Sequence, residues 1–300
     1  MSSINFSEKF PVGEADENTR IDKLLSSWLP ELSRSKWQEL IRRDCVKIDG
    51  ESIKPSYRVS AGEAVDIEVP EDFDSDSLVP EDLPLDVVYE DPFLIGVNKP
   101  SSLVVHPGPG HETGTLANAL IYHYEDLPDL PDPTRPGIVH RLDKDTSGVI
   151  VVARTGETYL ELKEQFKNRT VDKEYIALVD GHFDEKKGLI DAPVGRSNKD
   201  KTKMKVKLGG KEARTEFAVL DEFSNSTLLK VKPVTGRTHQ IRVHMNYIGH
   251  QILGDSYYGA PPADRLMLHA SRLTVTHPVK GSDLTLEAPI PEELKKLFVR

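Results

Sequence analysis

An acidic residue in a short polar segment is the first candidate for chemistry in this sequence. Asp143 lies within His140-Arg141-Leu142-Asp143-Lys144-Asp145-Thr146-Ser147-Gly148, which runs directly into the apolar residues 149–153. That apolar stretch is short and β-branched, so it predicts a buried strand with a polar loop at its entrance. A carboxylate held there can act as a nucleophile or base if a cation keeps it ionised. The alternative is turn chemistry, in which Asp and Ser bond their own backbone.

A second segment supplies cations of the kind that such a carboxylate needs. Residues 236–244 contain Arg237 and Arg242, and residues 240–247 predict a helix. Arg237 precedes this helix, whereas Arg242 lies within it, three residues after His239. A guanidinium aimed at Asp143 would keep that acid ionised and oriented. The alternative is two surface arginines on a helix.

The elements around these segments predict the class of fold. Further strands are expected at 87–89, 93–100, 173–179, 215–219, 227–231 and 273–276, and a further helix at 116–124. Strands outnumber helices and do not alternate regularly with them. We therefore expect an α+β domain with a mixed, largely antiparallel sheet.

The first seventy residues predict a separate small domain. Apolar residues recur at helical spacing over 21–29 and 37–41, and residues 45–48 and 65–69 alternate as strands. We expect a small α/β domain at 18–70, after a flexible tail at 1–17 and before an extended acidic linker at 71–86. The second domain then occupies 87–300. The basic residues at expected exposed positions of the small domain are Arg20, Lys23, Arg34, Lys36, Arg42 and Arg43.

Charge is unevenly distributed along the chain. The formal net charge of −10 argues against a nucleic-acid partner, but residues 71–91 hold nine acids and no Lys or Arg. Residues 196–214, in contrast, hold eight Lys or Arg and two acids. A local basic face of this kind binds phosphate. The alternative is a solvated hairpin.

Length and composition bound the class of protein. Three hundred residues suit two domains, and 37% hydrophobic residues can form a sizeable core. The single cysteine, Cys45, excludes an intramolecular disulfide. The sequence has no apolar run of the ~18 residues that span a membrane, and its first residues lack the pattern of a signal peptide. We therefore expect a cytoplasmic protein with no membrane partner.

Three segments resemble the signatures of one enzyme family. Residues 140–148 are similar to His-Arg-Leu-Asp-x-x-Thr-Ser-Gly, the catalytic-aspartate motif of the large-ribosomal-subunit class of pseudouridine synthases. Lys173-Glu174-Tyr175 resembles the family's Lys-x-Tyr signature, and residues 236–244 resemble the third. Further matches spread over nearly the whole of 87–289. The resemblance implies the pseudouridine synthase fold and an activity that isomerises uridine in RNA with no metal and no cofactor.

The resemblance also implies a role for each site residue. Asp143 is the expected catalytic carboxylate and Arg242 its ion-pair partner. Tyr175 offers a flat face to uracil and a hydroxyl for proton transfer, although without the resemblance it would be assigned to the core. The residues expected to contact substrate are His140, Arg141, Lys173 and Arg237. Of these, Arg141 would fill the gap left by a flipped base or hold a phosphate, and Arg237 would reach RNA phosphate.

The small domain resembles the S4 RNA-binding domain in residues 20–25, 33–35 and 46–50. The alternative is a small helical module that binds protein. With the family resemblance, this implies RNA as the partner of a monomeric enzyme. The expected RNA is large-subunit (23S) ribosomal RNA, free or in a pre-ribosomal large subunit, and the alternative is transfer RNA.

Two rival functions remain at this point. Asp143-Lys144-Asp145-Thr146 imitates the Asp-x-Asp-x-Thr of haloacid-dehalogenase-like phosphatases, which hold magnesium. In those enzymes the apolar strand precedes the acids, whereas here it follows them. The second rival is a catalytically inactive ribosome-assembly factor that uses only its RNA-binding domain. The retained Asp143, Tyr175 and Arg242 argue against it.

Overall fold

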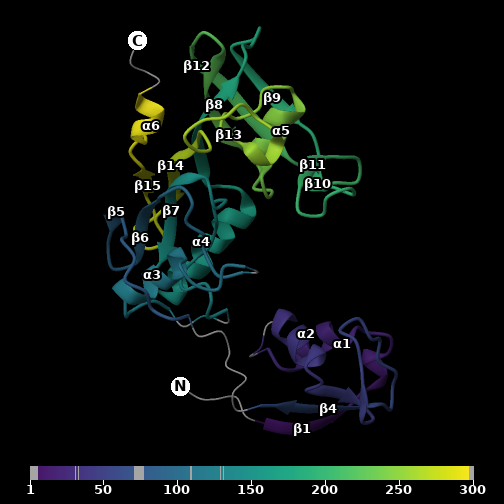
Figure 1. The fold of residues 1–300 in the computed structure, drawn as a ribbon. Coiled ribbons are helices and arrows are strands. Elements are labelled where there is room, and N and C mark those ends of the chain that lie inside the picture. Colours follow the sequence, from purple (N-terminus) through teal and green to yellow (C-terminus); the bar gives the residue numbers. More distant parts are fainter. Residues whose placement is uncertain are drawn as a thin grey trace. The chain divides into compact units, whose positions relative to one another are not determined.

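The computed structural model describes residues 6–30, 32, 34–70, 78–108, 110–128, 130 and 132–296. The chain divides into two compact units, residues 1–78 with 129–134, and residues 79–128 with 135–300. Figure 1 draws both units and labels their elements where there is room. Residues 1–5 of the expected tail and 71–77 of the expected linker lie outside the described residues. No helix of the described part is long and apolar enough to cross a membrane.

The smaller unit packs two helices on an antiparallel sheet. Its elements are β1 (Phe6–Pro11), a 3-10 turn (Glu14–Asp16), α1 (Ile21–Trp28), α2 (Arg34–Arg42), β2 (Val46–Ile48), β3 (Glu51–Ser52) and β4 (Ala64–Val69). The sheet order is β1-β4-β2-β3. Leu25 of α1 and Trp37 and Ile41 of α2 are fully buried against alternate residues of β2 and β4. The helical and alternating apolar patterns therefore form one core.

The expectation of a flexible tail over 1–17 is wrong for its described part. Strand β1 pairs antiparallel with β4 along its whole length, from Phe6↔Val69 to Pro11↔Ala64. Val12, which follows β1, is buried. The segment is polar and aperiodic in sequence. Its order comes from backbone hydrogen bonds to a strand more than fifty residues further along the chain.

The larger unit is built on one mixed sheet. Its elements are β5 (Val87–Glu90), β6 (Leu94–Lys99), α3 (Leu116–His123), β7 (Ser147–Ala153), α4 (Gly156–Asn168), β8 (Asp172–Asp180), β9 (Lys187–Asp191), β10 (Val194–Arg196), β11 (Met204–Val206), β12 (Arg214–Glu222), β13 (Ser226–Pro233), α5 (Gln240–Tyr247), a 3-10 turn (Ser256–Tyr258), β14 (Leu268–Thr276), β15 (Asp283–Glu287) and α6 (Glu292–Lys295). The sheet order is β5-β6-β7-β14-β8-β13-β12-β9, with β15 also paired to β14. Among the described strands, β7 and β14 form the one parallel pair. The predicted α+β class is confirmed.

Two apolar clusters cover different ends of this sheet. One joins β7, β14 and β15 to α4 through Leu162, and the other joins β8 and β13 to α5 through Ile241 and Met245. The strands β14 and β8 are neighbours at the centre of the sheet. The loop that carries Asp143 therefore approaches from one half, and α5, which carries Arg242, from the other (Figure 1).

The second half of the expected linker belongs to the larger unit. The side chain of Asn118 on α3 donates to the Val79 carbonyl, and the Glu81 backbone N–H donates to the Asn118 carbonyl. Asn98 on β6 donates to the Asp86 carboxylate. The expectation of an extended, self-repelling linker is therefore wrong for residues 79–86, because the carboxylates of Glu81 and Asp86 accept hydrogen bonds from Gly114 and Asn98 of the larger unit.

Gly148 explains why the polar segment ends in glycine. Its φ is +120°, and an added Cβ would lie 2.2 Å from the Ala270 carbonyl oxygen. This close approach occurs where β7 and β14 pair in parallel, His269 opposite Ser147 and Ala270 opposite Gly148. A side chain at this position would force the two strands apart and move the loop that precedes β7.

Candidate active site

The loop before β7 is held in place by a buried lysine. Lys99, at the end of β6, is fully buried, and its Nζ donates to the carbonyls of Pro100, Leu103 and Lys144 at 2.8–2.9 Å. Burial lowers the pKa of Lys99 to about 7, whereas three carbonyl acceptors match the three hydrogens of an ammonium group and favour its charged form. The Lys144 carbonyl follows directly on Asp143. Lys99 thus fixes the backbone at the candidate carboxylate.

Asp143 faces a guanidinium whose orientation is set by a second acid. Arg242 Nη1 lies 3.4 Å from Asp143 Oδ2, while its Nε and Nη2 donate to the two oxygens of Asp255 at 2.8 Å each. The Arg242 and Asp255 side chains are 6% and 2% exposed, and that of Asp143 is 21% exposed. The acid pair raises the pKa of Arg242 against the opposing effect of burial, so the group is a permanent cation.

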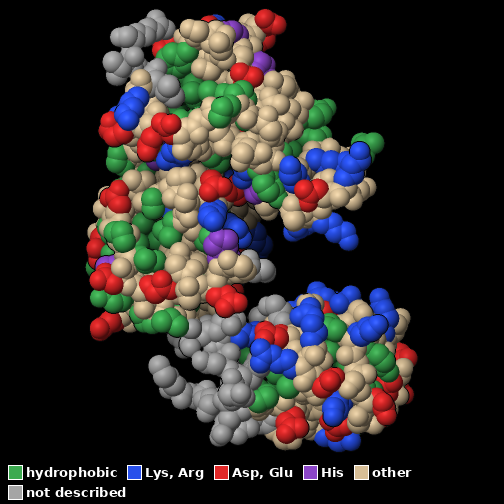
Figure 2. Space-filling view, viewed as in Figure 1, with side chains coloured by type: hydrophobic (Ala, Val, Ile, Leu, Met, Phe, Trp, Pro, Cys, Tyr) green, Lys and Arg blue, Asp and Glu red, His purple; other side chains and the backbone are tan. Residues whose placement is uncertain are grey.

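A cavity of about 460 Å³ opens over the Asp143 carboxylate. Asp143 is the single acidic side chain among the described residues that line it. The cationic residues in its wall are Arg141, Lys167, Arg169, Lys173, Arg237 and Arg242. Figure 2 shows Lys and Arg side chains at a hollow in the larger unit and along the hairpin of β10 and β11. The six cations of the wall therefore suit a polyanionic ligand, and the single carboxylate of Asp143 suits a neutral group of that ligand.

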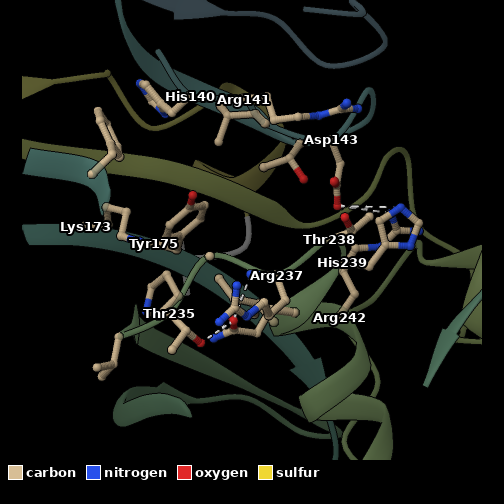
Figure 3. Close-up of a pocket in the computed structure, with 18 of the residues that line it drawn as sticks. His140, Arg141, Asp143, Lys173, Tyr175, Thr235, Arg237, Thr238, His239 and Arg242 are labelled. Atoms are coloured by element: carbon tan, nitrogen blue, oxygen red, sulfur yellow. Dashed lines mark hydrogen bonds and ion pairs between the residues drawn. The ribbon is translucent and has the colours of Figure 1, made fainter. Parts of the chain in front are cut away.

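Tyr175 and Lys173 enter the cavity from β8 (Figure 3). Tyr175 is half-buried, packs against the cluster around α5 and also lines the cavity. Burial, with a contribution from Asp143, raises the pKa of the Tyr175 hydroxyl well above its usual range. The hydroxyl is therefore a neutral donor at physiological pH. Burial, with the nearby Arg169, lowers the pKa of Lys173.

His140 and Arg141 lie differently from one another, although they are adjacent in sequence. The His140 ring stacks on Phe166 with centroids 4.4 Å apart, and its Nε2 accepts the Val151 backbone N–H at 3.0 Å. Burial lowers the pKa of His140 to about 3, so it stays neutral with its hydrogen on Nδ1. Arg141 is exposed at the cavity wall. The sequence grouped the two as substrate contacts, but His140 has a structural partner.

Arg237 lies on the cavity wall away from the Asp143–Arg242 pair (Figure 3). Its Nε donates to the Glu212 carbonyl, and its backbone N–H donates to the buried side chain of Gln240. The structure thus brings Arg242, and not Arg237, to Asp143. This agrees with the arrangement that the resemblance implied.

Three polar residues at the site received no role from the sequence. Asp255 orients Arg242, His239 Nε2 lies 3.9 Å from Asp143 Oδ2, and the Tyr258 hydroxyl lies 2.9 Å from His239 Nδ1. The Arg242 guanidinium also lies over the rings of Tyr257 and Tyr258, 5.6 and 5.2 Å from their centroids. Asp255 and Tyr258 lie in family-like segments, and that resemblance was the available signal. The contacts of Asp255, His239 and Tyr258 join separate segments of the chain, so residue spacing within one segment does not predict them.

The basic residues expected to bind RNA in the smaller unit differ in how exposed they are and in whether they already pair with an acid. Arg20 and Arg34 both donate to Asp22, whose side chain is fully buried. Burial alone would raise the pKa of Asp22, but hydrogen bonds from Arg20, Gln38 and Arg34 lower it to about 2. Lys23 and Arg42 are exposed, Lys36 is half-buried, and Arg43 pairs with Glu39. Arg20 and Arg34 therefore have a structural role in addition to any contact with RNA.

Comparisons with known proteins identify the family. The profile described as RNA pseudouridylate synthase matches residues 94–247, and that of the S4 domain matches residues 19–65. A Bacillus subtilis (strain 168) protein, "Uncharacterized RNA pseudouridine synthase YlyB", is 43% identical over 95% of each chain. "Ribosomal large subunit pseudouridine synthase D" of Nitrosomonas europaea is 43% identical over 93% of this chain and 83% of its own. Among solved structures, "Human RNA Pseudouridylate Synthase Domain Containing 1" matches with a TM-score of 0.58 and 28% identity, over 69% of this chain and 83% of its own.

This chain therefore belongs to the RNA pseudouridine synthase family and is an isomerase with an N-terminal S4 domain. The expected fold, family and enzyme class are confirmed. RNA as the partner is supported by the S4 domain.

Proposed function

We propose that this enzyme converts uridine to pseudouridine in large-subunit ribosomal RNA, with Asp143 as the reacting carboxylate. The observation that carries the assignment is the position of Asp143 as the one acid among the described residues of a cavity wall that has six cations. The relatives named for the ribosomal large subunit support the choice of RNA.

The reaction needs few protein groups because it conserves every atom. The bond between ribose C1′ and uracil N1 breaks, the base turns, and a bond forms from C1′ to C5. The hydrogen leaves C5 as a proton, and N1 carries one in the product. Three chemical routes are open to Asp143. Its carboxylate can attack C1′ of the ribose, attack C6 of the base, or abstract a proton, so all three routes use the same group.

The rest of the cavity suits an extruded nucleotide. The Tyr175 ring supplies a face on which uracil stacks, and its neutral hydroxyl supplies a proton donor. Arg141, exposed at the wall, fills the space that the base leaves or holds a phosphate, and Arg237 and Lys173 attract the backbone.

The substitution Asp143→Asn tests the reacting group. It should abolish isomerisation and leave RNA affinity within a few-fold, because the amide has nearly the same shape but neither attacks nor abstracts. Asp145→Asn is the matched control, since Asp145 lies in the same loop, is exposed and does not line the cavity. Turnover by pure Asp143→Asn above the deamidation background would refute the assignment.

Mapping pseudouridine across total RNA, with and without the protein, tests the substrate. Loss of sites from large-subunit ribosomal RNA is the expected result. Loss from transfer RNA alone would move the enzyme to the alternative substrate. Complete rescue of cellular function by Asp143→Asn would favour a role in ribosome assembly that does not need chemistry.

The S4 domain is proposed to supply affinity rather than chemistry. Deleting residues 1–70 should weaken binding to the natural RNA more than it slows the bound-state reaction, because a tethered module raises the effective concentration of its substrate. Single-turnover rates at saturating protein give the comparison. A collapse of the bound-state rate at unchanged affinity would instead place the S4 domain in the active site.

A further inference from the structure

His239 lies between the candidate carboxylate and the half-buried Tyr258. Its Nε2 faces Asp143 Oδ2 at 3.9 Å, and its Nδ1 lies 2.9 Å from the Tyr258 hydroxyl. The side chains of His239 and Asp143 are 18% and 21% exposed. Figure 3 shows Asp143 pointing toward His239. No step proposed above uses this histidine.

The partners of Tyr258 determine which ring nitrogen of His239 carries the hydrogen. Among the described residues, the Tyr258 hydroxyl contacts the Met204 backbone N–H at 3.3 Å and His239 Nδ1. The N–H of Met204 can only donate, so the hydroxyl accepts there, and of its two described contacts Nδ1 is the one that can accept the hydrogen of the hydroxyl. A neutral imidazole has one hydrogen, which must then sit on Nε2. Tyr258 thereby turns the N–H of His239 toward Asp143.

The charges around His239 are consistent with a neutral ring. Burial, with Arg242 and Arg141, lowers the pKa of His239 and outweighs the opposite effect of Asp143 and Asp255. Burial raises the pKa of Tyr258 to about 12, so its hydroxyl keeps the hydrogen that it donates.

The backbone at His239 is held in a rare conformation. Its φ is +55° at the residue before α5, a region that costs energy for a residue with a side chain. The turn is fixed by Gln240, whose buried side chain accepts from Thr235 Oγ1 and the Arg237 N–H and donates to the Arg214 carbonyl. Backbone strain that the surrounding hydrogen bonds maintain is typical of functional sites, where a side chain must be held in one orientation.

We propose that His239 is a positioning residue that acts through Asp143. The Nε2–H of His239 and the Nη1 of Arg242 both point toward Oδ2 of Asp143. No described residue donates a hydrogen bond to Oδ1, so this second oxygen of Asp143 is left to react with the nucleotide. The 3.9 Å separation exceeds a hydrogen bond in the free enzyme and shortens when RNA excludes water from the cavity. The inference rests on Asp143 being the reacting group.

Nitrogen NMR of the full-length protein with ¹⁵N-labelled histidine tests the tautomer without any assay of activity. We expect the Nδ1 of His239 to show the shift of an unprotonated ring nitrogen and Nε2 that of a protonated one, with assignment by loss of the signals in His239→Gln. In Tyr258→Phe the preference should weaken or reverse. A hydrogen on Nδ1, or two protonated nitrogens, in the wild-type protein at neutral pH would overturn the proposal.

Two amide substitutions test the function. The side-chain amide of His239→Gln reaches about as far as Nε2, whereas that of His239→Asn reaches only as far as Nδ1. We expect His239→Asn to lower the single-turnover rate at saturating protein by about ten- to a hundredfold, the effect of losing one hydrogen bond to a charged group. His239→Gln should restore a substantial part of that rate, and RNA affinity should change little in either variant.

Equal rates for the two variants, whether both high or both low, would overturn the positioning role. Asp143→Asn, measured alongside, keeps this result separate from the proposed function. If Asp143→Asn is active, the reacting group itself is wrong. If Asp143→Asn is inactive while the two His239 variants match each other, only the role of His239 fails.

Discussion

Arg242, in the wall of the cavity that Asp143 lines, forms a two-pronged ion pair with Asp255, with Nε and Nη2 each 2.8 Å from a carboxylate oxygen. The third nitrogen of the guanidinium remains for Asp143 at 3.4 Å. The geometry of the arginine fork therefore decides which guanidinium nitrogen faces Asp143. Because Asp255 already pairs with Arg242, Asp143 is held without being fully neutralised.

Replacing Arg242 with lysine should separate charge from geometry. Lysine keeps the cation but has a single nitrogen, which cannot bond both oxygens of Asp255 and also reach Asp143. We expect at least a tenfold lower single-turnover rate, and a loss of about 3–5 kcal/mol of unfolding free energy in Arg242→Ala, which leaves Asp255 buried without its cation. Arg272→Lys is the control, because Arg272 and Glu287 form an ion pair with both side chains exposed. Matching behaviour of the two lysine variants would contradict the prediction.

Arg237→Ala should act on RNA binding alone. If Arg237 contacts one phosphate, its removal weakens affinity and lowers the slope of log affinity against log salt by about one. The bound-state rate and the pH–rate profile should stay as in the wild type. Lys232→Ala, which removes a cation already paired with Asp172, is the control. A changed pH profile with an unchanged salt slope would mean that Arg237 serves the carboxylate instead.

His140 should make stability depend on pH in the mildly acidic range. Its pKa is about 3 when folded and ordinarily 6.5, so between these values the unfolded chain binds a proton that the folded chain does not. The free energy of unfolding should therefore fall as pH falls from 6.5 toward 3. In His140→Gln the dependence should be shallower by about 1 kcal/mol per pH unit, measured by urea unfolding at several pH values. Parallel curves for the two proteins would refute this.

Asp22 should stabilise the smaller unit at neutral pH. Its pKa of about 2 lies below the usual 3.8, so its contribution is present above pH 3.8 and is lost as pH falls through 2. Asp22→Asn should lower the unfolding free energy of this unit by about 2 kcal/mol, since Arg20 and Arg34 lose a shared partner but can turn to water. Hydrogen exchange of α1 and α2 amides in the full chain measures the change. Asp66→Asn, in an exposed pair with Lys9, should cost less than about 1 kcal/mol.

Periodic segments were predictable from the sequence alone. The helix predicted at 240–247 is α5, and the predicted strand at 149–153 falls within β7, which is buried at every position. Helix α4 went unpredicted, because its fully buried positions are only Thr158 and Leu162 and most of its surface is charged. Strand β1 went unpredicted because its partner, β4, lies far along the chain.

The candidate site divides in the same way. The sequence determined the residue types of the site, because the motifs that carry Asp143, Tyr175 and Arg242 are local strings of residues. Tertiary structure decided which arginine reaches Asp143, that His140 bonds the backbone of β7, and that Asp255 orients Arg242. Local spacing fixes the direction of a side chain only within its own element. The Asp143–Arg242 contact joins a loop and a helix that are 99 residues apart, and the packed sheet brings those two elements together. The His140–Val151 and Arg242–Asp255 contacts span only 11 and 13 residues, but each still joins two different elements.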